Sequence, residues 1–444
     1  MNPLMNRRTF LNRSGRSLAG VGAVTAAPSW LHAASVSKRP ELRITRILIQ
    51  EARGRRLTPV APNAYAAYRG YEVREPVLRI QTAQNVEGIC HCPVRAEKLK
   101  PLLGLDAVKL FSWDGDRVRG VAQEHKTLLD DLIGADVALF DLLGRALRRP
   151  SADLLGARVR ETTPVYDSSL YMEDLLKPSE RTGLAYIQGT EPREPAEWVA
   201  RKAEWILQQP FGVRVLKIKT GRAKWIESFD AALQRDIAVF KAVRKIVGKD
   251  VTLLVDGNDG YKARPLAAAE FAEAVAADGL FAMEEMFPEE KLDETREEKR
   301  RARAAGMKTK LCDGEGHVGG IRAKFRDERF TFGGKEEPLW DIDQGDMNQS
   351  GYLRLRAKAK ENAPLGLTMA PHNFGSKFGL YAMIHLGLVV PNWEFCESDD
   401  TQIPALVPGG FEIRSGHARL TDAAGLGVTL REDKLEKPSV VLEV

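Results

Sequence analysis

The 444-residue sequence predicts an α/β barrel preceded by a smaller domain of mixed α+β structure. Two patterns and the chain length indicate this fold class. Apolar and polar residues alternate in residues 42–49 and 77–82, which is typical of antiparallel strands with one solvent-facing side. After Pro164, short apolar runs alternate with amphipathic stretches, which is typical of repeated β-α units. The length suits one barrel-sized domain together with one smaller domain.

Residues 1–34 form a leader that resembles a twin-arginine export signal, with a small-residue cleavage site near Ala33 or Ala34. Arg7 and Arg8 stand before a weakly apolar stretch rich in Ala and Gly, which is too short to span a bilayer. A disordered basic tail is the alternative interpretation. We expect a soluble protein that is exported to the periplasm through the twin-arginine pathway and has no membrane span.

Composition argues against several other classes of function. The formal net charge is +5, and the leader arginines account for four of these charges, which leaves +1 for the rest of the chain. That balance gives no electrostatic reason to expect binding to nucleic acid or to an anionic membrane.

The four cysteines are too few for a disulfide scaffold. Cys90-His91-Cys92 is not followed by a second pair of ligand residues that could complete a metal site. We expect buried thiols there rather than a metal site.

Residues 41–160 are expected to form the smaller α+β domain, which caps the barrel. An aromatic loop that contains Tyr65, Tyr68 and Tyr71 connects its antiparallel strands. Apolar residues at three- and four-residue steps in residues 128–147 then predict helices. Residues 401–444 are expected to return to this domain after the barrel.

The barrel itself is expected to occupy residues 161–400. Its predicted strands are residues 213–219, 251–256, 280–284, 309–312, 339–342, 367–369 and 393–396, and the clearest predicted helices are residues 229–247, 266–276 and 289–305. About eight such β-α units would close a parallel sheet into a barrel. Residues 323–338 are charged, contain glycine and fit neither pattern.

A polar residue stands near the C-terminal end of each of these predicted strands. These residues are Lys219, Asp256, Glu284, Glu315, Asp346, His372 and Glu397. Successive members lie 25 to 37 residues apart, close to the roughly 30 residues of one β-α unit. A single acid at a strand end is often only a helix cap. Because the strand C-termini of a barrel meet at one face, we expect the seven side chains to converge there.

Asp256, Glu284 and Glu315 come from three successive predicted strands. Neighbouring strands lie about 4.8 Å apart, so the three carboxylates could not all stay ionised without a cation. A ligand set made only of oxygen atoms favours a hard divalent ion, Mg²⁺ above Mn²⁺. Glu285 and Asp313 stand next to these candidates, and an acidic rim of ordinary helix caps is the alternative interpretation.

Lys217 and Lys219 lie two residues apart in a predicted strand, so their side chains share one face. Two buried ammonium groups side by side require acids nearby, and the carboxylates above supply them.

Asp346 and His372 follow the next two predicted strands, so their side chains could contact each other. A carboxylate on one imidazole nitrogen fixes the tautomer and leaves the other nitrogen free to move protons. A purely structural histidine is the alternative.

This ordered set of motifs resembles the enolase superfamily, in particular its mandelate racemase and muconate lactonizing enzyme group. The motifs are Lys217-Ile218-Lys219, Val255-Asp256-Gly257-Asn258, Met283-Glu284-Glu285, Gly314-Glu315, Gln344-Gly345-Asp346 and Ala370-Pro371-His372-Asn373. The resemblance runs from about residue 42 to residue 432. It departs from the family pattern after Glu285, where Met286 and Phe287 stand before Pro288. The resemblance implies a modified TIM barrel of the (β/α)7β type.

The resemblance also implies a role for each site residue. Asp256, Glu284 and Glu315 would hold the metal, and Lys219 would be a base whose pKa is lowered by burial, by Lys217 and by the metal. Lys217 would stay cationic and polarise a substrate carboxylate. His372, held by Asp346, would face Lys219 across the substrate. Glu397, with Glu394 as the alternative, would hydrogen-bond a carboxylate oxygen and could donate a proton.

The expected reaction is Mg²⁺-dependent removal of the proton next to a carboxylate, through an enediolate. The family's breadth favours an acid-sugar dehydratase, a lyase, acting on a small carboxylate substrate. A racemase or epimerase of a 2-hydroxy acid is the alternative, and cycloisomerisation is a third. An exported, non-catalytic protein that binds metal or sugar acid is the alternative outside enzymes. The resemblance further implies a homo-oligomer.

Overall fold

The computed structural model describes residues 39–92, 94–132, 134–316 and 320–444, and residues Arg39–Val444 form one compact unit. The leader expected at residues 1–34 lies outside the described residues. Within the described part, no helix is both long and apolar enough to cross a membrane.

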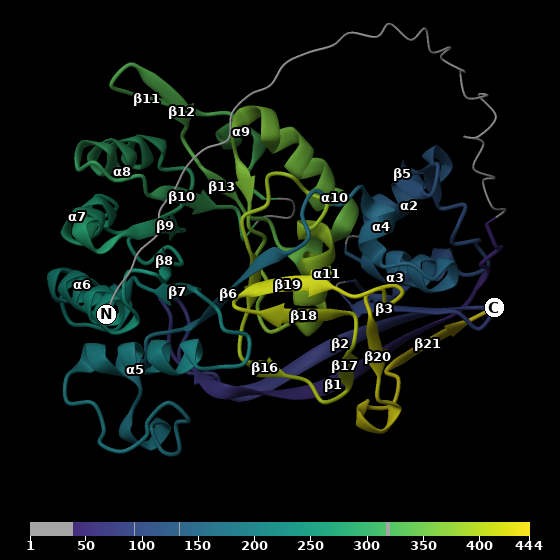
Figure 1. Cartoon of the computed structure of the whole chain (residues 1–444), viewed down its shortest axis with the longest axis horizontal. Helices are drawn as coiled ribbons and strands as arrows, with labels where there is room; N and C mark the ends of the chain where they lie inside the picture. Colours follow the sequence, from purple (N-terminus) through teal and green to yellow (C-terminus); the bar gives the residue numbers. More distant parts are fainter. Residues whose placement is uncertain (1–38, 93, 133, 317–319) are drawn as a thin grey trace, which may run out of the picture. The chain divides into compact units, whose positions relative to one another are not determined.

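The first sheet is antiparallel, as the alternating pattern predicts. β1 (Ile44–Val60) pairs with β2 (Gly70–Thr82), and β2 pairs with β3 (Glu87–His91). Two strands from the far end of the chain, β16 (Thr401–Gln402) and β21 (Val440–Glu443), also pair with β1 (Figure 1). This sheet is therefore built from both ends of the described chain.

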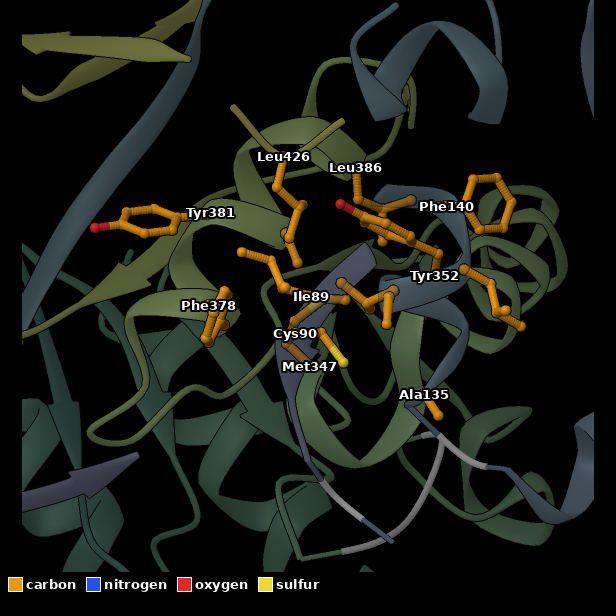
Figure 2. Packing of buried hydrophobic residues seen from close by; sticks show 14 of the residues in the cluster. Ile89, Cys90, Ala135, Phe140, Met347, Tyr352, Phe378, Tyr381, Leu386 and Leu426 are labelled. Carbon is orange, nitrogen blue, oxygen red and sulfur yellow. The ribbon is translucent and has the colours of Figure 1, made fainter. Parts of the chain in front are cut away.

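Helices pack on this sheet around a shared core. The helices predicted in residues 128–147 are α2 (Lys126–Asp131) and α3 (Asp136–Leu147), and Gly134 between them has a positive φ of 80°. Figure 2 shows apolar side chains from β3, α3 and the later helices meeting in this core. The rings of Phe140 and Tyr352 meet edge to face with centroids 5.5 Å apart. The other elements of this region are α1 (Ala96–Leu99), β4 (Phe111–Asp114), β5 (Arg117–Val121) and α4 (Ser151–Leu155).

The second sheet of the described chain has ten strands, and eight of them are parallel and close into a barrel. The parallel strands are β6 (Thr163–Leu170), β7 (Val215–Lys219), β8 (Thr252–Asp256), β9 (Leu280–Glu284), β10 (Lys310–Asp313), β13 (Ile342–Asp343), β14 (Thr368–Met369) and β15 (Cys396–Ser398). The other two, β18 (Phe411–Arg414) and β19 (His417–Leu420), are antiparallel and extend the sheet from β6. β15 pairs with β6, and a bridge between Met369 and Trp393 joins β14 to the segment before β15. The barrel fold is therefore confirmed, although β15 begins three residues later than predicted.

Seven helices follow the first seven strands on the outside of the barrel (Figure 1). They are α5 (Pro195–Leu207), α6 (Phe229–Val247), α7 (Ala267–Ala274), α8 (Leu292–Ala304), α9 (Ala323–Arg326), α10 (Met347–Asn362) and α11 (Lys377–Gly387). In the described chain no α-helix follows β15. Short strands follow it instead: β16, β17 (Leu406–Pro408), β18 (Phe411–Arg414), β19 (His417–Leu420) and β20 (Val428–Leu430). The architecture is thus (β/α)7β.

The stretch at residues 323–338, which fits neither sequence pattern, forms α9 and a hairpin. The hairpin consists of β11 (Arg329–Phe332) and β12 (Lys335–Pro338), paired antiparallel. Figure 1 shows it beside α8, projecting outward from the strands of the barrel.

Candidate active site

Strand register brings the first polar residues of the barrel face together. Lys219 pairs with Asp256 across β7 and β8, and Asp256 pairs with Glu284 across β8 and β9. Glu284 pairs with Cys312 on β10, and Glu315 follows three residues later in the loop. The intervening Gly314 has a φ of 105°, where a side chain would meet Ile321 and Asp343. The C-terminal ends of four neighbouring strands therefore place these residues side by side.

Asp256, Glu284 and Glu315 form a compact carboxylate cluster. One oxygen atom from each lies within 4.8 Å of one from each of the others. Asp256 and Glu284 are buried, and the buried Oε2 of Glu315 has no hydrogen-bond partner among the described residues. Three converging hard oxygen donors, one of them unsatisfied, fit a divalent cation such as Mg²⁺.

The charges in this cluster are strongly coupled. Burial and the charge of Asp256 raise the pKa of Glu284 to about 8, although Lys217 opposes the shift. Burial would also raise the pKa of Asp256, but Lys219 and Lys217 hold it below its usual value. Positive charges on more than one side therefore stabilise the ionised carboxylates of the cluster.

Lys217 lies at the centre of the acids inside the barrel. Its Nζ donates hydrogen bonds to Glu284 Oε1 and Oε2 at 2.8 and 3.0 Å, and it lies 3.2 Å from Glu397 Oε1 and 3.4 Å from Asp256 Oδ2. Burial lowers the pKa of Lys217, but these carboxylates raise it more, so that the pKa lies well above its usual value. This environment favours the protonated form of the side chain.

Lys219 lies at the edge of the cluster, beside Asp256. Its Nζ donates hydrogen bonds to Asp256 and, at 2.9 Å, to Asn258 Oδ1. Burial and Lys217 lower the pKa of Lys219, but Asp256 and the other acids raise it more, so the pKa lies above its usual value. The carboxylates that raise it are Asp256, Glu284 and Glu315, the three candidate metal ligands. The lowered pKa expected for Lys219 beside a bound metal stays a prediction.

His372 and Asp346 meet at the ends of β13 and β14. His372 Nδ1 lies 2.7 Å from Asp346 Oδ2, and Nε2 lies 3.4 Å from Glu315 Oε1. Asp346 also caps α10, because its Oδ1 accepts a hydrogen bond from the Gln349 backbone N–H at 2.8 Å. Burial lowers the pKa of His372, but Glu315 and the hydrogen bond with Asp346 raise it to about 10. Lys219 and His372 therefore contact different carboxylates of the cluster.

The two candidates at the last strand, Glu397 and Glu394, lie in different places. Glu397 is within β15, where its Oε2 accepts a hydrogen bond from the Asn373 backbone N–H at 2.7 Å, close to Lys217. Glu394 pairs with Lys310, the first residue of β10, at the amino end of that strand. Burial raises the pKa of Glu397, but Lys217 and His372 lower it more, so that the pKa lies below its usual value. Its contact with a substrate carboxylate and its role as a proton donor stay predictions.

Two residues that received no role from the sequence also contact the site. Asn258 binds the Lys219 ammonium and has a positive φ of 41°, a conformation that asparagine tolerates. The Tyr166 ring centroid lies 5.4 Å from Lys217 Nζ. Asn258 stands two residues after Asp256, and this spacing could have indicated from the sequence that it contacts the site. The position of Tyr166 near Lys217 follows only from the pairing of β6 with β15. Cys90 is buried and Cys92 partly so, and neither is in a disulfide.

Residues 198–434 match the family described as enolase C-terminal domain-like. The chain belongs to this family. Its sequence is 25% identical to the arabinonate dehydratase of Saccharolobus solfataricus over 352 residues, which cover 76% of this chain and 81% of that protein. It is also 25% identical to the D-galactarolactone cycloisomerase of Agrobacterium fabrum over 322 residues, covering 69% of this chain and 73% of that one.

Solved structures with the same fold include two acid-sugar dehydratases. The galacturonate dehydratase of a Geobacillus species, in a complex with Mg, aligns with a TM-score of 0.73 at 21% identity, covering 88% of this chain and 94% of that chain. The L-talarate/galactarate dehydratase of Salmonella typhimurium aligns with a TM-score of 0.63 at 19% identity, covering 95% and 98%. At these identities the structures support the fold, an enolase-superfamily barrel with an N-terminal capping domain.

Proposed function

We propose that this protein is an acid-sugar dehydratase of the enolase superfamily, which removes the proton next to a carboxylate in a Mg²⁺-dependent reaction. The observation that carries the proposal is the carboxylate cluster with Lys219 against Asp256 and the His372–Asp346 pair against Glu315. The dehydratases among the relatives support the same reaction class. The overall change is loss of water from two neighbouring carbons of the substrate.

Asp256, Glu284 and Glu315 would hold the cation, with Mn²⁺ as the alternative to Mg²⁺. When bound, such an ion would polarise the substrate carboxylate and stabilise the negative charge that develops when the α-proton leaves. Lys217 is cationic and fully buried, so it would stabilise the same charge from the barrel interior. Glu397 lies next to Lys217 and would orient it.

The positions of Lys219 and His372 support their proposed roles as the two bases. Lys219 projects from the end of β7 beside Asp256, whereas His372 is fixed through Nδ1 by Asp346 and turns Nε2 toward the cluster. In the dehydration, one of these groups takes the α-proton, and a protonated group on the other side assists departure of the β-hydroxyl as water. The C–H and C–O bonds break, and the resulting enol tautomerises to a 2-keto-3-deoxy acid.

Incubation with Mg²⁺ and a panel of sugar acids in D₂O tests the proposal. A 2-keto-3-deoxy product is the expected result. Deuterium uptake at the α-carbon without elimination would instead identify a racemase or epimerase, and an isomeric product with neither would identify a cycloisomerase. If the protein binds metal stoichiometrically but shows neither deuterium exchange nor product, the result would favour a non-catalytic protein that binds metal or sugar acid.

Separate Lys219→Ala and His372→Ala variants test the two bases. Each is expected to lower kcat by about 100-fold or more, the usual contribution of an acid or base. Full activity in either variant would contradict that residue's role. Glu394→Gln is the matched control, because this acid pairs with Lys310 away from Lys217 and should leave kcat unchanged.

We infer that the protein is exported to the periplasm by the twin-arginine pathway, on the support of Arg7-Arg8 and the small residues up to Ala34 in the sequence. Replacing both arginines with lysine should retain the protein, uncleaved, in the cytoplasm. Fractionation and N-terminal sequencing measure this outcome. Periplasmic, processed protein from the Arg7→Lys/Arg8→Lys variant would contradict the proposal.

A further inference from the structure

A cavity of about 600 Å³ lies outside the barrel wall, where the chain has no helix after β15. α5 and α11 contribute opposite walls, and the segment from β15 to β18 contributes most of the rest. Its size falls within the range of small-molecule sites, about 300 to 1,000 Å³. None of the seven residues of the strand-end set lines it.

The floor of this cavity is the outer side of β6 and β15. Tyr166 pairs with Glu397 and Asp167 pairs with Ser398. Because side chains alternate along a strand, Tyr166 and Glu397 lie toward Lys217 inside the barrel, whereas Asp167 and Ser398 line the cavity. One layer of backbone therefore separates the cavity from the active site.

Three acids, Asp167, Asp399 and Asp400, stand together at the cavity. Asp399 is compensated, because Arg56 Nε lies 3.4 Å from its Oδ2 and Lys377 donates to its backbone carbonyl at 2.9 Å. Asp167 and Asp400 are each 8% exposed, and no lysine, arginine or histidine in the described chain forms an ion pair with either. The charge of Lys202 opposes the rise in the pKa of both carboxylates, but neither forms a direct ion pair in the described chain.

Unsatisfied atoms mark the same place. Asp400 Oδ1 and Thr401 Oγ1 are buried at the cavity and have no hydrogen-bond partner in the part of the chain that the structure describes. Burial raises the pKa of Asp167 to about 7, with a further contribution from Asp400, and burial also raises the pKa of Asp400. Buried polar atoms normally have partners, so these atoms point to a ligand that donates hydrogen bonds.

The walls are apolar and aromatic. Trp205, Phe211, Tyr381 and Phe411 line them, and the rings of Tyr381 and Phe411 pack with centroids 4.7 Å apart. Figure 2 shows Tyr381 at the side of the apolar core with its hydroxyl directed away from the other labelled residues. Aromatic walls attract both apolar groups and organic cations.

We propose that this cavity binds a small organic ammonium compound, with its amino group at Asp167 and Asp400 and its apolar or aromatic part against the aromatic walls. Asp167 Oδ1 already accepts hydrogen bonds from Ser169, and Asp400 Oδ2 accepts them from Thr58. An ammonium group would add a positive charge beside both carboxylates and a hydrogen-bond donor for Asp400 Oδ1 and Thr401 Oγ1. This occupant fits better than a flat protein surface, because the unpartnered atoms of Asp400 and Thr401 are buried in residues that line the cavity. The site does not depend on the proposed dehydratase reaction.

Binding of three indole compounds to the Mg²⁺-loaded full chain tests the proposal. Tryptamine, tryptophol and indole-3-acetate share a ring and carry a cationic, a neutral and an anionic group, respectively. Calorimetry should detect tryptamine, and tryptophol should bind at least about tenfold more weakly, in line with the loss of a charge-assisted hydrogen bond. Equal binding of the three, or no tryptamine binding below about 10 mM, would overturn the proposal.

Asp167→Asn and Asp400→Asn should each weaken tryptamine binding about tenfold while keeping the shape of the side chain. Glu298→Gln is the matched control, because it neutralises a buried acid in α8 away from the cavity and should leave binding unchanged. If the aspartate variants fail to fold, Ile413→Trp, which fills the cavity from its wall, should abolish binding; retained affinity would contradict the site.

The cavity could be occupied by a second copy of the chain instead of a small ligand. Sedimentation with and without tryptamine distinguishes these two occupants. A Phe211→Glu variant that dissociates an oligomer, together with the absence of tryptamine binding to the unchanged protein, would assign the cavity to a subunit interface and overturn the proposal.

Discussion

Asp346 shows how one side chain at this site has two functions. Its Oδ1 caps α10 through the Gln349 backbone N–H, and its Oδ2 holds His372 Nδ1 at 2.7 Å. The cap depends on an oxygen acceptor, which asparagine also provides, whereas stabilisation of a protonated imidazole depends on the negative charge. The two functions can therefore be separated by substitution.

Asp346→Asn is expected to keep the thermal stability of the protein and to lower kcat by about 100-fold, because His372 loses its anionic partner. Asp346→Ala should lose the same activity and, in addition, about 1 kcal/mol of stability with the cap. Thermal unfolding and steady-state kinetics on the two variants measure the difference. Equal stability of the two variants would argue against the capping function of Asp346. An unchanged kcat in Asp346→Asn would argue against its function in catalysis.

At the scale of single elements, α8 contains a buried acid that no neighbour compensates. Glu298 is 3% exposed, its Oε1 has no hydrogen-bond partner among the described residues, and burial raises its pKa to about 8. Lys299, the next residue, is tied to the backbone oxygens of Pro338 and Leu339 and to Asp341. The helix thus holds a carboxyl group that favours the protonated form.

Glu298 should make stability depend on pH. Its folded pKa lies above the unfolded value of 4.5, so its stabilising contribution is present below about pH 4.5 and is lost as the pH rises toward 8. Relative to the unchanged protein, Glu298→Gln should gain stability across this window, by up to a few kcal/mol. Chemical denaturation at several pH values measures this gain. A constant difference between the two proteins would contradict it.

At the scale of the whole molecule, the barrel face concentrates negative charge that a cation would balance. Asp256, Glu284 and Glu315 come from three separate strand ends, so a bound ion would tie these strands together. Any ligand that binds only the folded state stabilises it by an amount that grows with its concentration.

Addition of Mg²⁺ to chelator-treated protein should raise the thermal midpoint, with about 2.7 kcal/mol of stabilisation at 100 times the dissociation constant. Glu315→Gln should shift this response to higher Mg²⁺ concentration, because it removes one charged ligand. Glu394→Gln, the acid that pairs with Lys310, provides the control. An identical Mg²⁺ response in Glu315→Gln would exclude this residue from the metal site.

The barrel fold could be predicted from the sequence because strand and helix periodicity is local. Lys217 and Lys219 share one face of β7 as their spacing of two requires, and the strand-end spacing brings the polar residues to one end of the barrel. The start of β15 was predicted less accurately, because a short strand is defined by its partner strand as much as by its own residues.

The sequence by itself determined the order of the strands and helices and the residue types at the strand ends. Only the tertiary structure placed Glu397 beside Lys217 and Glu394 beside Lys310, set Asp256 against Lys219, and joined Asp167 to Asp400 at one cavity. The physical reason is that periodicity records local backbone geometry, whereas pKa values and cavities depend on burial and on charges brought close by residues far apart in the chain.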